Sequence, residues 1–407
     1  MLQNARLKFM ILISEALTII ERETRSLKSE TIDLDYSVGR ILAKNIKADM
    51  NLPPFDRSQM DGFAVKSKDT RKAPVKLKVI GESVAGKGFG GKVKAGEAVR
   101  IMTGAPVPAG ADAVQKVELT VENDEFVEII ELAKPQQNIN LYASEVAEGA
   151  KIFGKGERII EQMIAALASF GYAQVKAFRK PRVSILSTGS EIVDVAETPG
   201  KDQIRNSNST MLKVFVRQAG GQAEILPRVG DDLKTIESTI KEAAKNCDVL
   251  IVSGGVSVGD YDFTKPALRS LGAEIFFEKI SLKPGKPTVF AKLNDTLIFG
   301  LPGNPVSSAV TFYLFVRPAI LQMQRAKDRK LKTGFARVAN RLKAAKERDS
   351  VLPASIEADE KGQLIIESLR FNGSSNFIAF ARANALVFVP QGKDLETGEI
   401  AEIMFLP

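Results

Sequence analysis

The 407-residue chain contains no histidine, no tryptophan and a single cysteine, Cys247. Without histidine, a Ser-His-Asp triad and the zinc sites built from cysteine and histidine are excluded. One cysteine also excludes a disulfide framework within the chain, and this composition fits a reducing, cytoplasmic compartment. Because Cys247 stands at the entrance to an apolar strand-like run, we expect it to be a core residue.

Long hydrophobic runs are absent as well. No segment approaches the ~20 apolar residues of a membrane span, and the run Phe9–Ile13 is too short for a signal sequence, so we predict no membrane association. Apolar residues at 44% and charged residues at 26% are ordinary globular values, which excludes global disorder. The length predicts about two to four domains. The sequence leaves open whether translation starts at Met1 or Met10.

The net charge of +8 comes from one segment. Residues 317–349 contain 11 Lys or Arg and 3 Asp or Glu, which equals the whole excess. A solvated junction between domains is favoured over a docking patch for an acidic partner. Since no nucleic-acid-binding motif accompanies the charge, we predict no nucleic-acid partner.

Four regions differ in pattern. Residues 10–50 appear helical and amphipathic, with Leu34, Val38, Ile41 and Leu42 spaced for one buried face, and together with 146–178 they predict a helical linker domain. Residues 51–145 are rich in Gly, Pro and Val and predict a β-rich domain. Residues 179–325 alternate strand, Gly-rich loop and helix, which is typical of an α/β domain with a mostly parallel sheet. Residues 326–407 predict a small β-barrel or sandwich. The fold class is therefore multidomain α/β plus β.

Gly-rich loops follow three apolar runs, 183–186, 249–252 and 296–299. In open α/β sheets, ligands bind at the carboxyl ends of the strands, and free N–H groups at helix starts bind phosphate. Each loop alone could be a plain turn between strand and helix, but three on one sheet favour a phosphorylated ligand. The candidate binding residues are Ser187, Thr188, Gly189, Ser253, Gly254, Gly255, Ser257, Pro302, Gly303, Asn304 and Pro305.

Charged residues accompany these loops. Glu191, Asp231 and Asp262 could hold Mg²⁺ against a phosphorylated ligand, although Asp231 could equally cap the helix that follows. Lys279, Lys283 and Lys286 flank a stiff Lys-Pro-Gly-Lys-Pro loop, 283–287, that we interpret as an oxyanion clamp.

Two segments of the β-rich region contain further candidates. Asp61 lies in the irregular segment 53–63, and Asp61-Gly62 could instead be only a turn. Thr103, in Thr-Gly after a strand, could donate to an anion or merely cap its turn.

Six ordered motifs together resemble the MoeA family of molybdopterin molybdenumtransferases, to which the gephyrin E domain is related. They are Pro-Pro-Phe-Asp with Met-Asp-Gly, Ile-Met-Thr-Gly-Ala-Pro-Val-Pro, Ser-Thr-Gly-Ser-Glu, Ser-Gly-Gly-Val-Ser-Val-Gly, Lys-Pro-Gly-Lys-Pro and Leu-Pro-Gly-Asn-Pro. The resemblance covers nearly the whole chain.

The resemblance implies that molybdate attacks adenylylated molybdopterin, that AMP leaves, and that Mg²⁺ is required. It implies a homodimer whose site lies between the α/β domain of one subunit and the β-rich domain of the other, with a molybdopterin adenylyltransferase as upstream partner. The functional residues it transfers are Asp61, Thr103, Glu191, Asp231, Asp262, Lys279, Lys283, Pro302, Pro305 and Ser375. Where the family has an Arg-rich run followed by Gly-Glu-Asp, residues 140–145 of this chain contain no arginine, and Glu145 stands in place of the aspartate. Glu145 is therefore a candidate metal ligand.

Two other functions remain open. One is molybdopterin adenylyltransferase activity, against which the flanking β domains argue, since that type of protein is a lone α/β domain. The other is a molybdopterin-binding scaffold like gephyrin, which fuses an adenylyltransferase domain through a long linker; this chain starts directly at the first helix.

Overall fold

The computed structural model describes residues 10–256, 262–369 and 376–407. The described chain separates into two compact units. One contains residues up to Lys44, Gly156–Glu161 and Gln174–Pro407, and the other contains Asn45–Lys155 and Gln162–Ala173. The finer four-domain division made from the sequence stays a prediction.

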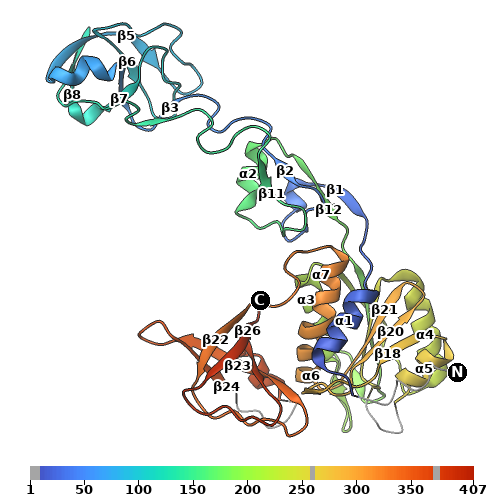
Figure 1. The fold of residues 1–407 in the computed structure, drawn as a ribbon. Helices are drawn as coiled ribbons and strands as arrows, with labels where there is room; N and C mark the ends of the chain where they lie inside the picture. Colours follow the sequence, from blue (N-terminus) through green and yellow to red (C-terminus); the bar gives the residue numbers. More distant parts are fainter. Residues whose placement is uncertain (1–9, 257–261, 370–375) are drawn as a thin grey trace. The chain divides into compact units, whose positions relative to one another are not determined.

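The larger unit is built on a six-stranded sheet with the order β16-β13-β17-β21-β20-β18 (Figure 1). Its strands are β13 (Arg182–Ser187), β16 (Gln222–Ile225), β17 (Val249–Ser253), β18 (Glu274–Phe277), β20 (Val289–Leu293) and β21 (Thr296–Leu301). Neighbouring strands from β16 to β21 are parallel, and β20 is antiparallel to both of its neighbours. The predicted mostly parallel α/β sheet is confirmed.

Both faces of this sheet are covered by helices. They are α1 (Ile13–Glu23), α3 (Ser207–Gln218), α4 (Leu233–Asn246), α5 (Thr264–Ser270), α6 (Pro305–Thr311), the π-helical turn η4 (Phe312–Val316) and α7 (Arg317–Met323). Side chains alternate between the two faces along each strand: Val249 and Ile251 pack in the cluster that contains α1, α3, α6 and α7, whereas Leu250 and Val252 pack in the one that contains α4 and α5. This explains why the strand sequences are continuously apolar.

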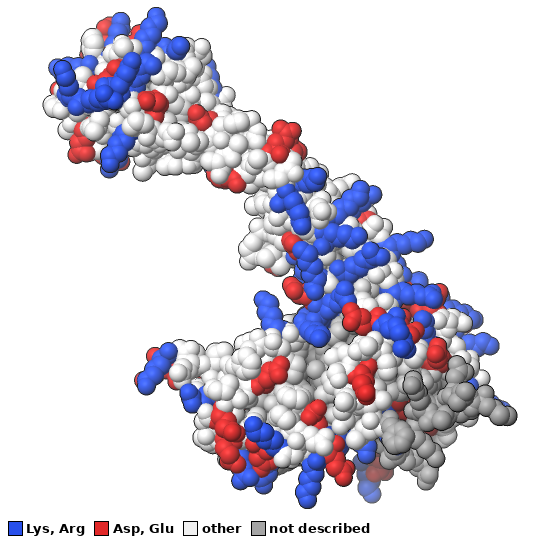
Figure 2. Space-filling model, viewed as in Figure 1, with Lys and Arg blue, Asp and Glu red and all other residues white. Residues whose placement is uncertain are grey.

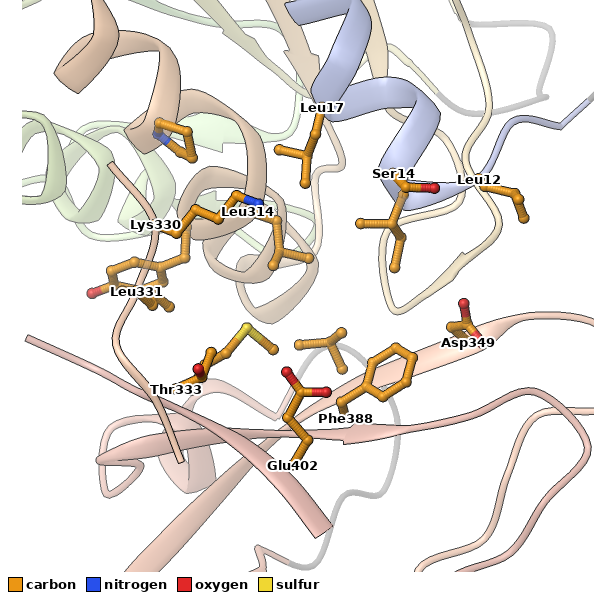
Figure 3. Close-up of a pocket in the computed structure, with 15 residues that line it drawn as sticks. Leu12, Ser14, Leu17, Leu314, Lys330, Leu331, Thr333, Asp349, Phe388 and Glu402 are labelled. Carbon is orange, nitrogen blue, oxygen red and sulfur yellow. The ribbon is translucent and has the colours of Figure 1, made fainter. Parts of the chain in front are cut away.

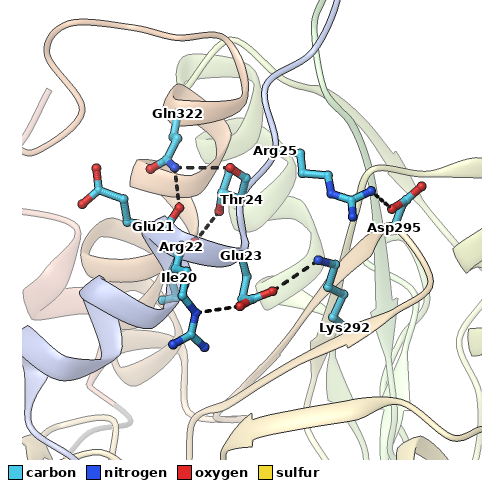
Figure 4. A network of polar contacts seen from close by, with 9 residues as sticks. All are labelled: Ile20, Glu21, Arg22, Glu23, Thr24, Arg25, Lys292, Asp295 and Gln322. Atoms are coloured by element: carbon cyan, nitrogen blue, oxygen red, sulfur yellow. Dashed lines mark hydrogen bonds and ion pairs between the residues drawn. The ribbon is translucent and has the colours of Figure 1, made fainter.

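The helix α1 belongs to this core. Ala16 and Ile20 are buried in the same cluster as α3 and α7. Polar contacts at its end fix it in place (Figure 4): Lys292 pairs with Glu23 at 3.3 Å, and Gln322 donates to the carbonyl oxygen of Glu21 at 2.6 Å.

The prediction that residues 10–50 are helical is wrong beyond Glu23. The segment Ser29–Asp33 forms β1, which pairs antiparallel with β12 (Gln174–Phe178), and η1 (Leu34–Tyr36) follows. Leu34 and Ile41 are buried, but Val38 is 42% exposed, so their spacing does not mark one helical face. Pairing with β12 outweighs the weak local helical pattern, and Gly39 adopts a φ of +81°, which a helix does not allow.

Cys247 is buried at the end of α4, as expected for a core residue. Burial raises the pKa of its thiol, which favours the neutral form.

The C-terminal region forms a closed five-stranded β-barrel, which confirms the predicted end domain. The strands pair in the circular order β23-β24-β22-β26-β25 and back to β23. Their bounds are β22 (Thr333–Val338), β23 (Asp349–Ala358), β24 (Leu364–Ser368), β25 (Ala385–Val389) and β26 (Ile400–Phe405), with β19 (Leu282–Lys283) joining β23 and the short helix α8 (Phe377–Phe380) preceding β25.

The smaller unit contains a second six-stranded sheet, with the order β7-β4-β6-β5-β9-β8. Its elements are β2 (Ile46–Lys47), β3 (Arg57–Ser58), β4 (Gly62–Val65), η2 (Ser67–Lys72), β5 (Val75–Ser83), β6 (Glu97–Ile101), β7 (Ala113–Lys116), η3 (Val117–Leu119), β8 (Thr120–Asn123), β9 (Phe126–Ile129), β10 (Ile139–Asn140), β11 (Lys151–Phe153) and α2 (Met163–Ser169). Phe63 and Val65 pack on one face of this sheet and Ala64 on the other. The predicted β-rich region is confirmed.

Three basic residues of the segment 317–349 are paired with acidic side chains from other parts of the chain. Lys327 pairs with Glu157 at 2.6 Å, Arg329 with Glu21 at 2.9 Å, and Arg341 with Asp394 at 2.7 Å. Figure 2 shows Lys and Arg mixed with Asp and Glu over the C-terminal barrel. This pairing supports the interpretation of a solvated junction.

One helix of the described chain, Pro305–Met323, is long and apolar enough to cross a membrane, which the sequence analysis did not anticipate. However, 78% of its apolar window is buried inside the protein. Its hydrophobic surface is therefore used in the core, where Phe312, Phe315 and Ile320 are buried.

The core of the sheet gives a prediction about stability. Phe299 is fully buried on β21, with its ring centroid 4.9 Å from that of Phe290. Phe299→Ala should lower the free energy of unfolding by about 3–5 kcal/mol, because it removes buried apolar surface and leaves a cavity. Urea unfolding of the whole chain measures it. The control Phe335→Ala, at a side chain that is 70% exposed, should change it by no more than about 0.5 kcal/mol. Equal effects of the two substitutions would contradict the assigned core.

Candidate functional site

A cavity of about 1170 Å³ lies at the carboxyl ends of β13, β17 and β21. In-register pairing puts Ser187 beside Ser253 and Ser253 beside Leu301, so the loops that follow the three strands leave the sheet at the same edge. The predicted residues that line this cavity are Ser187, Thr188, Gly189, Glu191, Asp231, Ser253, Gly254, Gly255, Asp262, Pro302, Gly303, Asn304 and Pro305.

Close packing of the loops requires glycine. Gly254 has a φ of +96°, and a Cβ atom there would lie 2.7 Å from the carbonyl oxygen of Thr188. The Thr188 N–H donates to the carbonyl oxygen of Ser253, and the Gly254 N–H donates to that of Leu301. The first two loops are thus tied to their neighbouring strands, which gives the cavity a backbone wall.

The start of α6 is as predicted from Asn304-Pro305. Asn304 is the N-cap, with an extended backbone, and Pro305 is the first residue of the helix. Both line the cavity.

The sequence analysis missed Asn208, which joins the loops together. Its side-chain amide donates to Ser253 Oγ at 3.0 Å and to the carbonyl oxygen of Gly303 at 2.7 Å. Asn206, the N-cap of α3, accepts from the Ser209 N–H and from Ser187 Oγ at 3.1 Å each. The available signal was the Asn-Ser-Asn run at the start of a helix, a pattern typical of N-caps.

The three predicted carboxylates all face this cavity, but in different surroundings. Asp231 accepts from the Ser190 N–H at 3.2 Å and from Ser190 Oγ at 3.0 Å. Asp262 is paired with Lys265 at 2.5 Å, and burial raises the pKa of its carboxyl despite the lysine. The N-cap of α4 is Asp232, not Asp231, so the capping alternative for Asp231 is wrong.

A magnesium site made by these carboxylates alone is not formed. Within residues 10–256, 262–369 and 376–407, no group of three or more Asp, Glu or Cys side chains is close enough to hold a metal ion. Because Mg²⁺ usually binds one or two carboxylates and completes its shell with water and substrate phosphate, a site that includes Glu191 or Asp231 stays a prediction.

The lysine clamp is not part of the cavity wall. Lys279, Lys283 and Lys286 are exposed, and none of them lines the cavity; Pro287 does. The stiff loop is present: Pro284 and Gly285 are buried, Pro287 is half-buried at the cavity, and the lysines are exposed to solvent. Their role as an oxyanion clamp stays a prediction.

Asp61 and Thr103 form a pair in the smaller unit. Asp61 Oδ1 accepts from the Thr103 N–H and from Thr103 Oγ1, both at 2.7 Å. The backbone hydrogen bond, reinforced by the hydroxyl, lowers the pKa of Asp61, so this exposed carboxylate stays ionised. The pair therefore connects the turn between β3 and β4, which contains Asp61, to the end of β6, where Thr103 lies.

Glu145 is paired with Arg57 at 3.0 Å. The arginine supplied by β3 neutralises it, so its role as a metal ligand stays a prediction. Ser257 and Ser375 lie outside the described residues.

A second cavity, of about 380 Å³, lies away from the sheet edge (Figure 3). It is lined by α1, by the helix that contains Leu314, and by barrel residues such as Phe388 and Glu402. Its wall is mainly apolar, and none of the predicted site residues line it.

The fold and the cavity define a multidomain α/β protein with a large cavity at the edge of its mainly parallel sheet and two β-rich regions. Protein-family models match three segments: "MoeA N-terminal region (domain I and II)" over residues 11–171, "Probable molybdopterin binding domain" over 184–322, and "MoeA C-terminal region (domain IV)" over 336–406. The chain belongs to the MoeA family.

Curated relatives match over nearly their whole length. A molybdopterin molybdenumtransferase from Haemophilus influenzae is 36% identical over 92% of this chain and 93% of the relative, and one from Bacillus subtilis is 35% identical over 93% and 90%. The solved structure of a molybdopterin biosynthesis MoeA protein from Pyrococcus horikoshii OT3 superimposes with a TM-score of 0.85 at 27% identity, covering 98% of this chain and all of that one.

The Asp61–Thr103 pair can be tested directly. Thr103→Val removes the hydroxyl donor and keeps the N–H, so the pKa of Asp61 should rise toward its ordinary value without a change of fold. Carboxyl ¹³C NMR titration measures it. Thr120→Val is the control, because the Thr120 hydroxyl donates to the carbonyl oxygen of Val117 and not to a carboxylate of the described chain. An unchanged Asp61 titration in Thr103→Val would contradict the role given to the hydroxyl.

Proposed function

We propose that this protein is a molybdopterin molybdenumtransferase that inserts molybdate into adenylylated molybdopterin and releases AMP. The observation that carries the proposal is the cavity where three Gly-rich loops of one parallel sheet meet in a chain that matches the family from end to end. A phosphorylated ligand fits this edge, because backbone N–H groups and small hydroxyls line it.

The residues that line the cavity have different proposed roles. Thr188 and the Gly254-Gly255 turn allow close approach of the phosphate groups, and Asn208 holds the loops in register. Glu191 and Asp231 would hold Mg²⁺ against the substrate phosphates, where the ion offsets the negative charge that builds up as the phosphoanhydride bond breaks. No imidazole base is required, which agrees with a chain that contains no histidine.

We also propose that Asp61 and Thr103 complete the site from the partner in a homodimer. They lie in the smaller unit, which does not contain the α/β sheet, and their side chains form an ionised carboxylate–hydroxyl pair that bonds to no third residue among the described ones. An upstream adenylyltransferase would supply the adenylylated substrate, and the protein would act in the cytoplasm, away from nucleic acid and membranes.

Removal of one carboxylate tests the catalytic assignment. Glu191→Gln keeps the size of the side chain but removes the charge, so turnover should fall by at least about tenfold, the loss of one charged contact in the transition state. The measurement is AMP release from adenylylated molybdopterin with molybdate and Mg²⁺. Glu360→Gln, at an exposed side chain in the turn between β23 and β24 and outside the cavity lining, is the matched control. Wild-type turnover in Glu191→Gln would remove Glu191 from the mechanism, and binding without AMP release in the unmodified protein would favour a scaffold.

The shared site is tested by mixing two inactive variants. If each site combines Asp61 of one subunit with Glu191 of the other, a heterodimer of Asp61→Ala and Glu191→Ala retains one intact site. An equal mixture with random subunit exchange should then recover about one quarter of the wild-type activity, because half of the dimers are mixed. No recovery after verified exchange would place each site within one subunit.

A further inference from the structure

The cavity contains one guanidinium that the sequence analysis did not consider. Arg205 lies on β15 (Ile204–Arg205), which pairs in parallel with β14 (Ile192–Val193) to form a small ribbon over the cavity. The ribbon is fixed on both sides of Arg205: the Ile204 N–H donates to the carbonyl oxygen of Glu191 at 2.9 Å, and the Asn206 N–H donates to that of Val193 at 2.8 Å.

The side chain of Arg205 is anchored but retains free donors. Its Nε donates to the carbonyl oxygen of Glu197 at 3.0 Å, which directs the guanidinium plane. No acidic side chain of the described chain pairs with its two Nη groups. An arginine held in this way presents two parallel N–H donors, the geometry that matches two oxygens of a phosphate.

Arg205 is also the single positive residue among the described residues that line the cavity. The other charged ones are Glu191, Asp231 and Asp262, and the predicted lysines are outside. A ligand with several phosphate charges would be repelled by this wall without a cation, so Arg205 is the protein's own counter-charge at this edge.

The surroundings of Arg205 indicate which part of the ligand it contacts. Ile204 on β15 and Val195 in the turn after β14 are 58% and 54% exposed, and Phe377 of α8 is 48% exposed; all three line the cavity. An apolar surface beside a guanidinium suits a flat ring attached to a phosphate, as in a nucleoside monophosphate. Molybdate is a tetrahedral oxyanion like phosphate, but it has no ring.

We propose that Arg205 binds the phosphate of the adenylyl group and so selects and positions the adenylylated form of the substrate. This inference rests on the proposed function. It predicts that Arg205 contributes to the affinity for AMP, the product that leaves, and not to the affinity for molybdate.

The experiment is calorimetric titration of the full-length protein with AMP in the presence of Mg²⁺. Arg205→Gln keeps hydrogen-bonding capacity without charge and should bind AMP at least about tenfold more weakly, the loss of one charge-assisted hydrogen-bond pair. Arg205→Lys should be intermediate, since it keeps the charge but not the fork. Arg217→Ala, at the far end of α3 and exposed, should bind like the wild type.

Steady-state kinetics distinguish whether Arg205 binds the adenylyl phosphate or molybdate. In Arg205→Gln, KM for the adenylylated substrate should rise while KM for molybdate stays unchanged. A raised KM for molybdate with unchanged AMP binding would overturn the assignment, as would unchanged values of both. If Arg205→Gln unfolds thermally at the same temperature as the wild type, the loss of AMP affinity does not come from a damaged fold. If the unmodified protein releases no AMP, the proposed function fails; if it does and Arg205→Gln behaves identically, only this inference fails.

Discussion

Burial of the central strands on both faces is the constraint on which the rest of the larger unit depends. Strands β13, β17 and β21 are buried at nearly every position because helices cover each face of the sheet. If such a strand shifted by one residue along its axis, each of its side chains would move to the opposite face of the sheet and lose its packing partners. The register of the strands is therefore fixed. Fixed register brings the ends of all three strands to one edge, and the cavity forms there.

At that edge the loops are organised by hydrogen bonds rather than by charge. Asn208 connects the second and third loops, and Asn206 connects the first loop to the start of α3. Thr188 is 5% exposed, and its hydroxyl has no hydrogen-bond partner among the residues that the structure describes. A buried hydroxyl without a partner is costly, and a ligand that supplies one removes that cost. The site is therefore prepared for a polar ligand before the ligand arrives.

The sequence predicted the parts of the site that depend on strand order alone. Ser187, Ser253 and Pro302 follow apolar strands, so their common position could be inferred from the α/β pattern. The sequence could not predict the direction of side chains on a connecting loop: Lys283 and Lys286 are exposed, whereas Pro284 and Gly285 between them are buried. Arg205 was missed because it lies on a strand of only two residues, which show no periodicity in the sequence. This strand is defined only by its pairing with Ile192–Val193.

The N-terminal region shows the same limit. The spacing of Leu34, Ile41 and Leu42 suggested a helix, yet Ser29–Asp33 pairs with a strand about 145 residues further along the chain. Short patterns are weak when a distant partner offers a complete hydrogen-bond ladder.

By itself the sequence determined the class of fold, the family and the loops that meet at the sheet edge. Hydrophobic periodicity and the positions of glycine can be recognised within short stretches of the chain, without knowledge of distant contacts. The tertiary structure decided which charged groups face the cavity. That choice depends on how surface loops pack and which strands they pair with, and these contacts join residues that are far apart in the chain.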